Sequence, residues 1–349
     1  MIKSLNLPLV FVYIGISSLG LLNLFVLNPN LFLYQFIFFL VSFVVFLVVS
    51  FTPLRVYELL SYPLYILNIL LLLLVFVFGE ITRGSTRWIA IGGINIQPSE
   101  IAKLTLVLAL SLLLSKKKFS NLTLKEILFT ALVFFPSFIL VFLQPDLGTS
   151  IIFLVIFIVL LVVAGVNKNL IFIGVTVAGI LSAPIWSVLQ NYQKSRVVSF
   201  LNPSADPLGT GYNVLQSKIA IGSGGFWGKG LGAGTQSHLS FLPENTTDFV
   251  FAAFSEEWGF IGSILIVVFY FLLLFIILSL VRKKISSFSR LVLYGILVIF
   301  FMHILVNIGM NIGVMPVTGI PLPFFSYGGS SFLSLSIMLG VVNSVANNS

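Results

Sequence analysis

Residues 254–281 read FSEEWGFIGSILIVVFYFLLLFIILSLV, and every residue after Glu257 in this stretch is uncharged. A helix needs about 20 mainly apolar residues to cross the hydrocarbon core of a bilayer, so the stretch predicts a transmembrane helix. Comparable runs recur along the chain and predict an all-α polytopic membrane protein, a single integral membrane domain over residues 1–349 with ten transmembrane helices. The predicted spans are about 9–27, 31–51, 59–79, 98–115, 126–143, 148–166, 169–189, 254–281, 290–312 and 326–345.

The composition agrees with a membrane as the solvent. Charged residues make up 8% of the 349 residues, hydrophobic residues make up 58%, and the mean hydropathy is +1.15. A soluble domain carries roughly 25% charged residues because water must wet its surface. The composition therefore excludes a cytosolic enzyme, a secreted domain, a nucleic-acid binder and a disordered protein. The absence of cysteine excludes disulfides, thiolate metal sites and a cysteine nucleophile.

The distribution of charge predicts the orientation of the chain. If the N-terminus is cytoplasmic, the inner loops carry eleven basic and two acidic residues, and the outer segments carry six basic and seven acidic residues. This excess of inner bases follows the positive-inside rule. It also explains the net charge of +8, so the basic character is no argument for a nucleic-acid partner. An even number of spans places both termini in the cytoplasm and the one long loop, about 190–253, outside, between the seventh and eighth helices.

The long outer loop contains a glycine-rich run. Residues 222–234 read GSGGFWGKGLGAG, which fails the phosphate-loop pattern because Ser or Thr does not follow the lysine. Two interpretations remain open: a backbone bent where side chains do not fit, or amides that cradle a lipid-linked diphosphate together with Lys218 or Lys229. The preceding stretch, Tyr212 to Ile221, is amphipathic and fits a helix lying on the membrane interface with Leu215 and Ile219 inward.

Carboxylates gather just before the eighth predicted span. Glu244, Asp248, Glu256 and Glu257 lie within 14 residues. A carboxylate held at an apolar boundary gains basicity, as a general base requires. The alternative is a helix N-terminus at which acidic groups complement the helix dipole.

Ionisable and polar residues near other spans can likewise be interpreted as functional or as structural groups. Glu100 and Lys103 begin the fourth span with an i,i+3 ion pair, and ionisable groups within a span are functional candidates by default. The same pair also fits a self-neutralising anchor of the helix. Asp146 fits both a cap of the sixth span and a functional residue. Asn307 and Asn311, one turn apart, are more often contacts between helices than ligand-binding groups, and the same holds for His303.

Several motifs resemble the SEDS family, the RodA/FtsW/SpoVE proteins of the bacterial cell wall, and the resemblance covers nearly the whole chain. The stretch Gly234-Thr235-Gln236-Ser237 before Phe241-Leu242-Pro243-Glu244 is most similar to the elongation branch of that family. The other matching segments are 97–103 (QPSEIAK), 144–149 (QPDLGT), Arg196, 202–203 (NP), 206–207 (DP), 211–212 (GY), 216–218 (QSK), 220–225 (AIGSGG), Gly230, 247–249 (TDF) and 319–330 (GIPLPFFSYGGS).

The resemblance implies a peptidoglycan glycosyltransferase of the bacterial cytoplasmic membrane. Such an enzyme joins lipid II units by β-1,4 bonds on the outer leaflet during cell elongation and releases undecaprenyl diphosphate. The family's essential aspartate corresponds to Asp248. Thr246 stands where relatives often have histidine, so no role is expected for a histidine there.

The chemistry needs a base for the attacking sugar hydroxyl and cations for the departing diphosphate. Asp248 is the predicted base; the predicted substrate-binding residues are Arg196, Lys218, Glu100, Lys103, Asp146 and Glu244. A divalent cation, Mg²⁺ or Mn²⁺, is a second source of positive charge. The resemblance further implies a class B penicillin-binding protein as transpeptidase partner and the elongation proteins MreC, MreD and MreB.

Two other functions stay open at this stage. A lipid II flippase would need charges near mid-membrane and a cavity reachable from both sides, whereas almost all intramembrane charge here lies near the outer ends. A non-enzymatic scaffold for a transpeptidase would leave the long polar loop unexplained.

Overall fold

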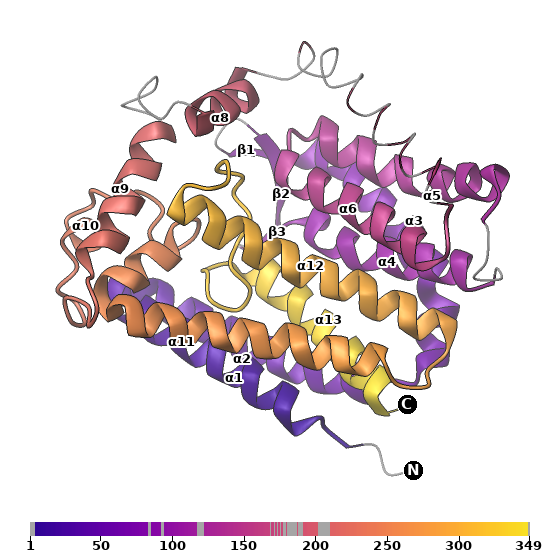
Figure 1. The fold of residues 1–349 in the computed structure, drawn as a ribbon, viewed down its shortest axis with the longest axis horizontal. Helices are drawn as coiled ribbons and strands as arrows, with labels where there is room; N and C mark the ends of the chain where they lie inside the picture. The colour runs from indigo at the N-terminus through magenta and orange to yellow at the C-terminus, as the bar shows by residue number, and fades with distance from the viewer. Residues whose placement is uncertain are drawn as a thin grey trace. The chain divides into compact units, whose positions relative to one another are not determined.

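The computed structural model describes residues 4–82, 85–91, 94–116, 122–167, 191–201 and 210–347, together with isolated positions between 169 and 187. Helices dominate these residues (Figure 1). They are α1 (Leu7–Leu27), α2 (Pro29–Phe51), α3 (Leu54–Phe78), α4 (Pro98–Ser115), α5 (Leu124–Leu143), α6 (Leu147–Val163), α8 (Asn191–Leu201), α9 (Thr210–Ser223), α10 (Thr235–His238), α11 (Val250–Val281), α12 (Ser287–Ile312) and α13 (Gly329–Asn347).

Eight of the described helices are long and apolar enough to cross a membrane. They correspond to eight of the ten predicted spans, with boundaries that differ by a few residues. The sixth predicted span forms a shorter apolar helix, α6, of 17 residues. The seventh, 169–189, lies outside the described residues apart from single positions.

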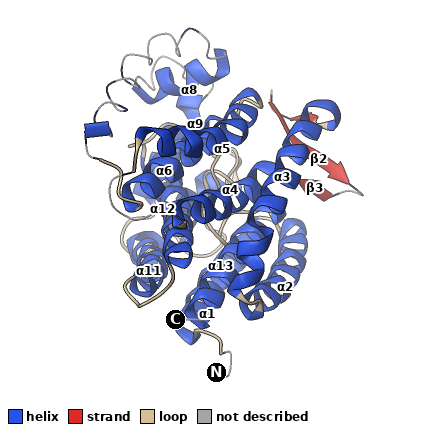
Figure 2. Cartoon of the chain, turned by 90° about the vertical axis from the view of Figure 1, so that its right-hand side faces the viewer, coloured by secondary structure: helices blue, strands red, loops and turns tan. Residues whose placement is uncertain are grey.

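A small sheet was not predicted. The strands β1 (Glu80–Thr82), β2 (Ser85–Ile91) and β3 (Ile94–Ile96) form an antiparallel sheet in the order β1-β2-β3, next to α3 (Figure 2). The expectation of an all-α protein was therefore wrong for this connection. The alternation of β-branched residues is limited to Ile89/Ile91 and Ile94/Ile96, which was too short to stand out between two apolar runs.

The chain divides into two compact units. The first comprises residues 1–51, 195–280 and 300–347, and within it α2 packs along α13 and α1. The second comprises residues 52–194 and 281–299, and within it α4 packs against α3, α5 and α6. Asp248, Arg196, Lys218 and Glu244 belong to the first unit, whereas Glu100, Lys103 and Asp146 belong to the second.

Burial of the helices follows the membrane prediction. α4 is buried over most of its length, whereas most of the apolar surface of α2, α3 and α5 is exposed. A helix that is apolar on all sides and yet exposed is stable in hydrocarbon and not in water. The exposed sides of α2, α3 and α5 are therefore lipid-facing, and α4 is the interior helix of its unit.

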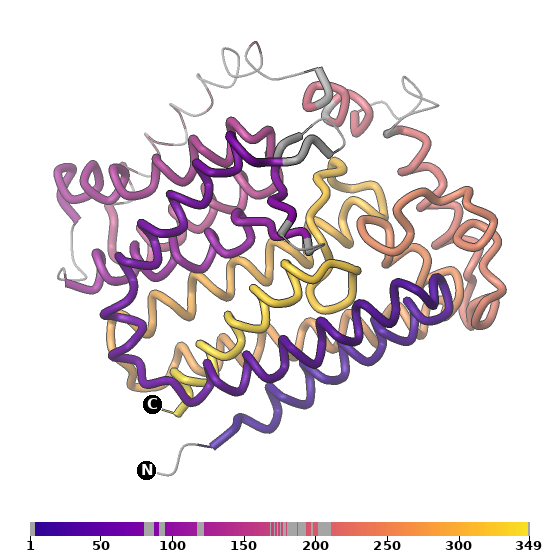
Figure 3. Tube along the Cα trace, turned by 180° about the vertical axis from the view of Figure 1, so that it is seen from behind, coloured from indigo at the N-terminus to yellow at the C-terminus, as the bar shows by residue number. Residues whose placement is uncertain are grey.

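The two ends of the described chain meet in the first unit. The backbone amide of Asn6 donates to Oδ1 of Asn343 at 2.8 Å, and that of Ser4 donates to Oδ1 of Asn347 at 3.1 Å. Figure 3 shows the beginning of α1 and the end of α13 close together. The first and last helices consequently begin and end on the same side of the molecule.

Candidate functional site

Asp248 ends a tight turn directly before α11. The carbonyl of Glu244, whose φ is 56°, accepts the amides of Thr247 at 3.1 Å and Phe249 at 3.0 Å. The hydroxyl of Thr247 donates to Oε2 of Glu244 at 2.9 Å. Glu244 therefore shapes the turn with both its backbone and its side chain, and this turn places Asp248 two residues before the first residue of α11.

Two buried amides of α12 hold the backbone of Asp248. Nδ2 of Asn307 lies 3.2 Å and Nδ2 of Asn311 lies 3.0 Å from the carbonyl oxygen of Asp248. Oδ1 of Asn311 accepts the amide of Ala252 at 3.0 Å. Both asparagines are fully buried. They are contacts between helices, as the sequence suggested, and the group they contact is the backbone of the predicted base.

The loop after α12 holds the same turn from the other side. The hydroxyl of Ser326 donates to the carbonyl of Thr247 at 2.7 Å, and the amide of Tyr327 donates to the carbonyl of Thr246 at 2.9 Å. Burial, followed by an electrostatic interaction with Tyr34, raises the pKa of Tyr327. Its hydroxyl therefore stays protonated at neutral pH.

That loop is fixed in turn by α12 and by aromatic packing. Asn307 donates to the carbonyl of Ile320 at 2.9 Å, and Nδ1 of His303 lies 3.0 Å from the carbonyl of Pro321. The ring of Phe324 packs edge-on against Tyr13, with 4.7 Å between centroids. The positive φ of Phe324, 60°, is held by this packing.

Gly319 brings the predicted base and a cation to one place. A β-carbon placed on Gly319 would lie 3.8 Å from Oδ2 of Asp248 and 3.9 Å from Nη1 of Arg196. A β-carbon at Gly319 would thus be in van der Waals contact with both groups, so this glycine lies beside a carboxylate and a guanidinium. A sugar hydroxyl and a diphosphate are groups that such a pair suits, as acceptor and as bidentate donor.

Lys218 lies elsewhere in the same unit, against the C-terminus of α12. Its side chain covers Gly313, where the φ is 77°, and Nζ would lie 2.5 Å from a β-carbon at that glycine. An ammonium group at this position interacts favourably with the dipole of α12. The structure thus places Lys218 beside the C-terminus of α12, and its predicted contact with diphosphate stays a prediction.

The glycine-rich run packs against a break in α11 at Gly259, whose φ and ψ are 66° and −159°. The amides of Phe260 and Ile261 donate to the carbonyls of Gly225 and Phe226 at 3.0 and 3.3 Å. The amides of Lys229 and Gly230 donate to the carbonyls of Glu256 and Glu257, both at 3.0 Å. The run therefore satisfies backbone groups that the break removes from the helix, which supports the bent-backbone interpretation.

Glu256 and Glu257 reinforce this contact. Both are buried; Glu256 accepts Nζ of Lys229 at 2.6 Å, and Glu257 accepts Nε2 of His238 at 2.7 Å. Glu256 also accepts the Thr235 hydroxyl, the amides of Gln236 and Ser237 and the Ser237 hydroxyl, at 3.0–3.2 Å. The ammonium of Lys229 therefore has a carboxylate partner within the protein and does not point to a phosphate cradle.

The second unit contains the other predicted cavity residues. Nζ of Lys103 lies 2.7 Å from Oε1 of Glu100, and both side chains are buried. Asp146 caps α6 by accepting the amide of Thr149 at 3.2 Å, as predicted, and it also lies 3.5 Å from Nη1 of Arg87. Arg87 is on β2, so its role was missed together with the sheet.

The described residues contain no group of three or more His, Asp or Glu side chains placed to hold a metal ion. A Mg²⁺ ion shared with a substrate diphosphate needs only one or two protein carboxylates. Asp248 is a carboxylate of that kind, so a divalent cation stays a prediction that the residues permit.

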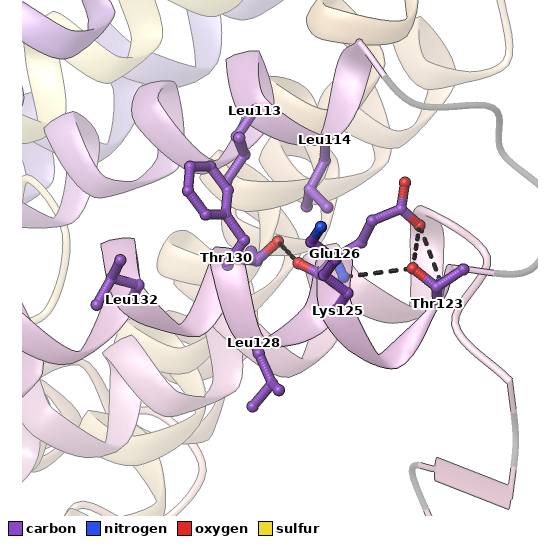
Figure 4. A pocket seen from close by; sticks show the side chains of 9 residues that line it. Leu113, Leu114, Thr123, Lys125, Glu126, Leu128, Thr130 and Leu132 are labelled. Carbon is purple, nitrogen blue, oxygen red and sulfur yellow. Dashed lines mark hydrogen bonds between the residues drawn. The ribbon is translucent and has the colours of Figure 1, made fainter.

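A cavity of about 570 Å³ lies in the second unit, between α4 and α5 (Figure 4). It is lined by apolar residues such as Leu113, Leu114 and Leu128 and by the residues of the α5 capping box, Thr123 and Glu126. None of the predicted site residues lines it. The cavity is therefore no part of the candidate site.

Comparisons with known proteins agree on one family. The family model FTSW_RODA_SPOVE, described as "Cell cycle protein", matches residues 2–349. Peptidoglycan glycosyltransferase MrdB of Escherichia coli is 40% identical over 299 residues, covering 85% of this chain and 80% of that protein. The protein of the same name from Helicobacter pylori is 36% identical over 346 residues, covering 97% and 89%.

A solved structure has the same fold. A chain in the structure described as "Structural coordination of polymerization and crosslinking by a peptidoglycan synthase complex" superposes with a TM-score of 0.88 at 32% identity. The match covers 99% of this chain and 98% of that chain.

Proposed function

This chain belongs to the FtsW/RodA/SpoVE family of cell cycle proteins, and we propose that it extends the glycan strands of peptidoglycan during cell elongation. It is a multi-pass membrane protein and a peptidoglycan glycosyltransferase, the activity for which its relatives are named. The substrate we propose is lipid II, presented on the outer leaflet.

In the proposed reaction, the sugar 4-hydroxyl of one lipid-linked unit attacks the anomeric carbon of another. The new carbon–oxygen bond forms as the bond to the diphosphate breaks, and undecaprenyl diphosphate leaves. The hydroxyl proton passes to the carboxylate of Asp248, which acts as general base. Arg196 stabilises the charge on the departing diphosphate, and Lys218 is the second proposed cation.

The observation that supports this proposal is the meeting of Asp248 and Arg196 at Gly319. The carboxylate of Asp248 and the guanidinium of Arg196 both lie beside this glycine, and the backbone of Asp248 is fixed by Asn307 and Asn311. A base and a cation held at one position are the minimum that this transfer requires.

The proposed topology has ten spans, with both termini in the cytoplasm and the long loop outside the inner membrane. The hydrogen bonds between Asn6 and Asn343 and between Ser4 and Asn347 support an even number of spans, because they place both ends on one side. Glu100, Lys103 and Asp146, which belong to the second unit, are proposed as substrate-binding residues.

The proposed partner is a class B penicillin-binding protein that cross-links the new strand. The related structure is described as a complex that coordinates polymerisation and cross-linking, which supports this assignment. MreC, MreD and MreB complete the proposed machinery.

The test is polymerisation of fluorescent lipid II by the purified protein, with and without its transpeptidase partner. Asp248→Ala should lower the rate of glycan-ladder formation by about 10²–10⁴-fold, the contribution typical of a general base. Glu58→Gln, an acidic residue on α3 with no proposed role, is the control. If Asp248→Ala polymerises at the wild-type rate, the base assignment is wrong. Label that crosses the bilayer of liposomes without forming ladders would instead support the flippase.

A further inference from the structure

We infer that Asn311, assisted by Asn307, is a positioning residue that keeps Asp248 out of α11 and so sets the direction of its carboxylate. The inference rests on the proposed function of Asp248 as general base. It assigns to two uncharged side chains of α12 the role of positioning the base.

The first turn of α11 lacks a capping side chain of its own. The helix begins at Val250, so the preceding residue, Phe249, occupies the cap position and cannot accept a hydrogen bond through its side chain. The amide of Ala252, at the third helical position, would have no partner inside the helix. Oδ1 of Asn311 accepts it at 3.0 Å, so the cap of α11 comes from another helix.

The same amide group also blocks extension of the helix. Extension of the helix by one residue would pair the amide of Ala252 with the carbonyl of Asp248, four residues earlier. Instead, Asn311 lies between them: its Oδ1 accepts from Ala252, and its Nδ2 donates to the carbonyl of Asp248 at 3.0 Å. The first backbone bond of the helix runs from Ala253 to Phe249 at 3.2 Å. The side chain of Asn311 therefore acts as a wedge: it separates the amide of Ala252 from the carbonyl of Asp248, and a hydrogen bond between these two groups would make Asp248 the N-cap of the helix.

Burial makes the wedge effective. Asn307 and Asn311 are both 0% exposed, so water cannot replace either amide. If Asn311 were lost, the amide of Ala252 and the carbonyl of Asp248 would be buried without this partner, and their direct helical bond would be the cheapest repair. That repair would draw Phe249 into the helix and make Asp248 the N-cap residue, whose carboxylate would then turn toward the free amides of the first turn and away from its present direction.

Asn307 links the backbone of Asp248 to the loop that contains Gly319 and Ile320. Its Nδ2 donates to the carbonyl of Asp248 at 3.2 Å and to that of Ile320 at 2.9 Å. Ile320 follows Gly319, the residue that borders the Asp248 carboxylate and Arg196. One side chain of α12 thus fixes the base and the loop that faces it. A displacement of about 1 Å at such a place can cost about 10²-fold in rate.

The test compares Asn311→Leu, which keeps the shape of the side chain and removes its hydrogen bonds, with Asn343→Leu. Asn343 is also fully buried and accepts a backbone amide, that of Asn6, at 2.8 Å, but it contacts no residue of the site. We expect both variants to lower the melting temperature in detergent. Only Asn311→Leu should lower kcat for lipid II polymerisation, by roughly 30–100-fold, with KM within about twofold of wild type.

Two further variants complete the test. Asn307→Ala removes one donor and carries the test under the same criteria if Asn311→Leu fails to fold. In an Asp248→Ala background, Asn311→Leu should cause no further loss of the residual rate, because a residue that acts through Asp248 has nothing left to position.

The outcomes separate this inference from the proposed function. Equal kcat values for Asn311→Leu and Asn343→Leu, or a loss that falls on KM alone, overturn the positioning role while Asp248→Ala remains inactive. Wild-type polymerisation by Asp248→Ala overturns the proposed base itself.

Discussion

Two adjacent glutamates, both buried and both ionisable, should lose very different amounts of stability on the same substitution. Glu256 is 0% exposed and Glu257 is 2% exposed. Composition and position do not distinguish them. Their hydrogen bonds do, and the prediction is that Glu256→Gln strongly destabilises the protein whereas Glu257→Gln is nearly neutral.

The magnitude for Glu256 follows from its partners. Oε1 accepts from Lys229, Thr235 and Gln236, and Oε2 accepts the amide and the hydroxyl of Ser237. In either orientation, the NH₂ group of glutamine would face a backbone amide, and the ion pair with Lys229 would be lost. Leaving a buried donor unsatisfied costs about 1–3 kcal/mol, and hydrogen bonds to charged groups are worth about 1.5–3 kcal/mol. The expected loss is therefore about 3 kcal/mol or more.

Glu257 offers a different environment. Oε1 accepts Nε2 of His238 at 2.7 Å and the amide of Gly232 at 3.3 Å, while Oε2 has no hydrogen-bond partner among the described residues. Glutamine can keep its oxygen at the first position and place its NH₂ at the second, where no donor opposes it. The unpaired NH₂ would replace a carboxylate oxygen that also has no hydrogen-bond partner among the described residues, so the two burial costs largely offset each other and the expected cost is about 1 kcal/mol.

The assay is thermal unfolding in detergent, followed by tryptophan fluorescence. For a chain of 349 residues, a loss of about 3 kcal/mol corresponds to a fall in melting temperature of roughly 4–6 °C, against roughly 1–2 °C for Glu257→Gln. Equal shifts for the two variants, or a larger one for Glu257→Gln, would refute the claim that hydrogen bonding and not burial decides the outcome.

Three further predictions concern stability and activity. Gly259→Ala should lower the melting temperature far more than Gly225→Ala, because a β-carbon at Gly259 would collide with backbone whereas one at Gly225 would meet open space. At Gly225 the only cost is that of holding alanine in a left-handed backbone conformation, about 1–2 kcal/mol. Similar melting temperatures for the two variants would contradict this. Lys103→Met should destabilise the protein by about 3–5 kcal/mol, because it leaves the carboxylate of Glu100 buried without its ammonium partner. Adding Glu100→Gln should restore most of the melting temperature but not polymerisation. If polymerisation is also restored, the role of the pair is purely structural. Asp146→Asn should keep the α6 cap and the wild-type melting temperature, since Asn caps as well as Asp. The same variant should lower the rate of polymerisation at least tenfold. Full activity would show that Asp146 only caps α6.

The spans were predictable because hydrocarbon imposes one simple requirement, a run of about 20 apolar residues, on each of them. The cap at Asp146 and the ion pair of Glu100 with Lys103 were also predictable, since both depend on neighbours three residues apart. The sheet was missed because its strands are short and lie between long apolar runs that dominate the pattern.

Contacts between distant residues could not be read from spacing. Asn311 lies 63 residues from Asp248, and Lys229 lies 27 residues from Glu256. Nothing local in the sequence distinguishes Asn311 from a residue that only joins two helices. The resemblance pointed to Asp248, but the side chains that hold it are visible only once α12 and α11 are packed together.

The contact of the glycine-rich run with the break in α11 limits how this part of the sequence can evolve. A β-carbon on Gly228 would lie 2.7 Å from the nitrogen of Gly259, and one on Gly259 would lie 2.7 Å from the carbonyl carbon of Trp227. Each glycine therefore leaves room for the backbone of the other segment, and no second substitution in either can relieve a first. Point mutations can accumulate at Gly222, where a β-carbon would meet open space, whereas change at Gly228 or Gly259 requires the whole contact to be rebuilt in one step. We expect lineages of this protein to vary around these two positions and not at them.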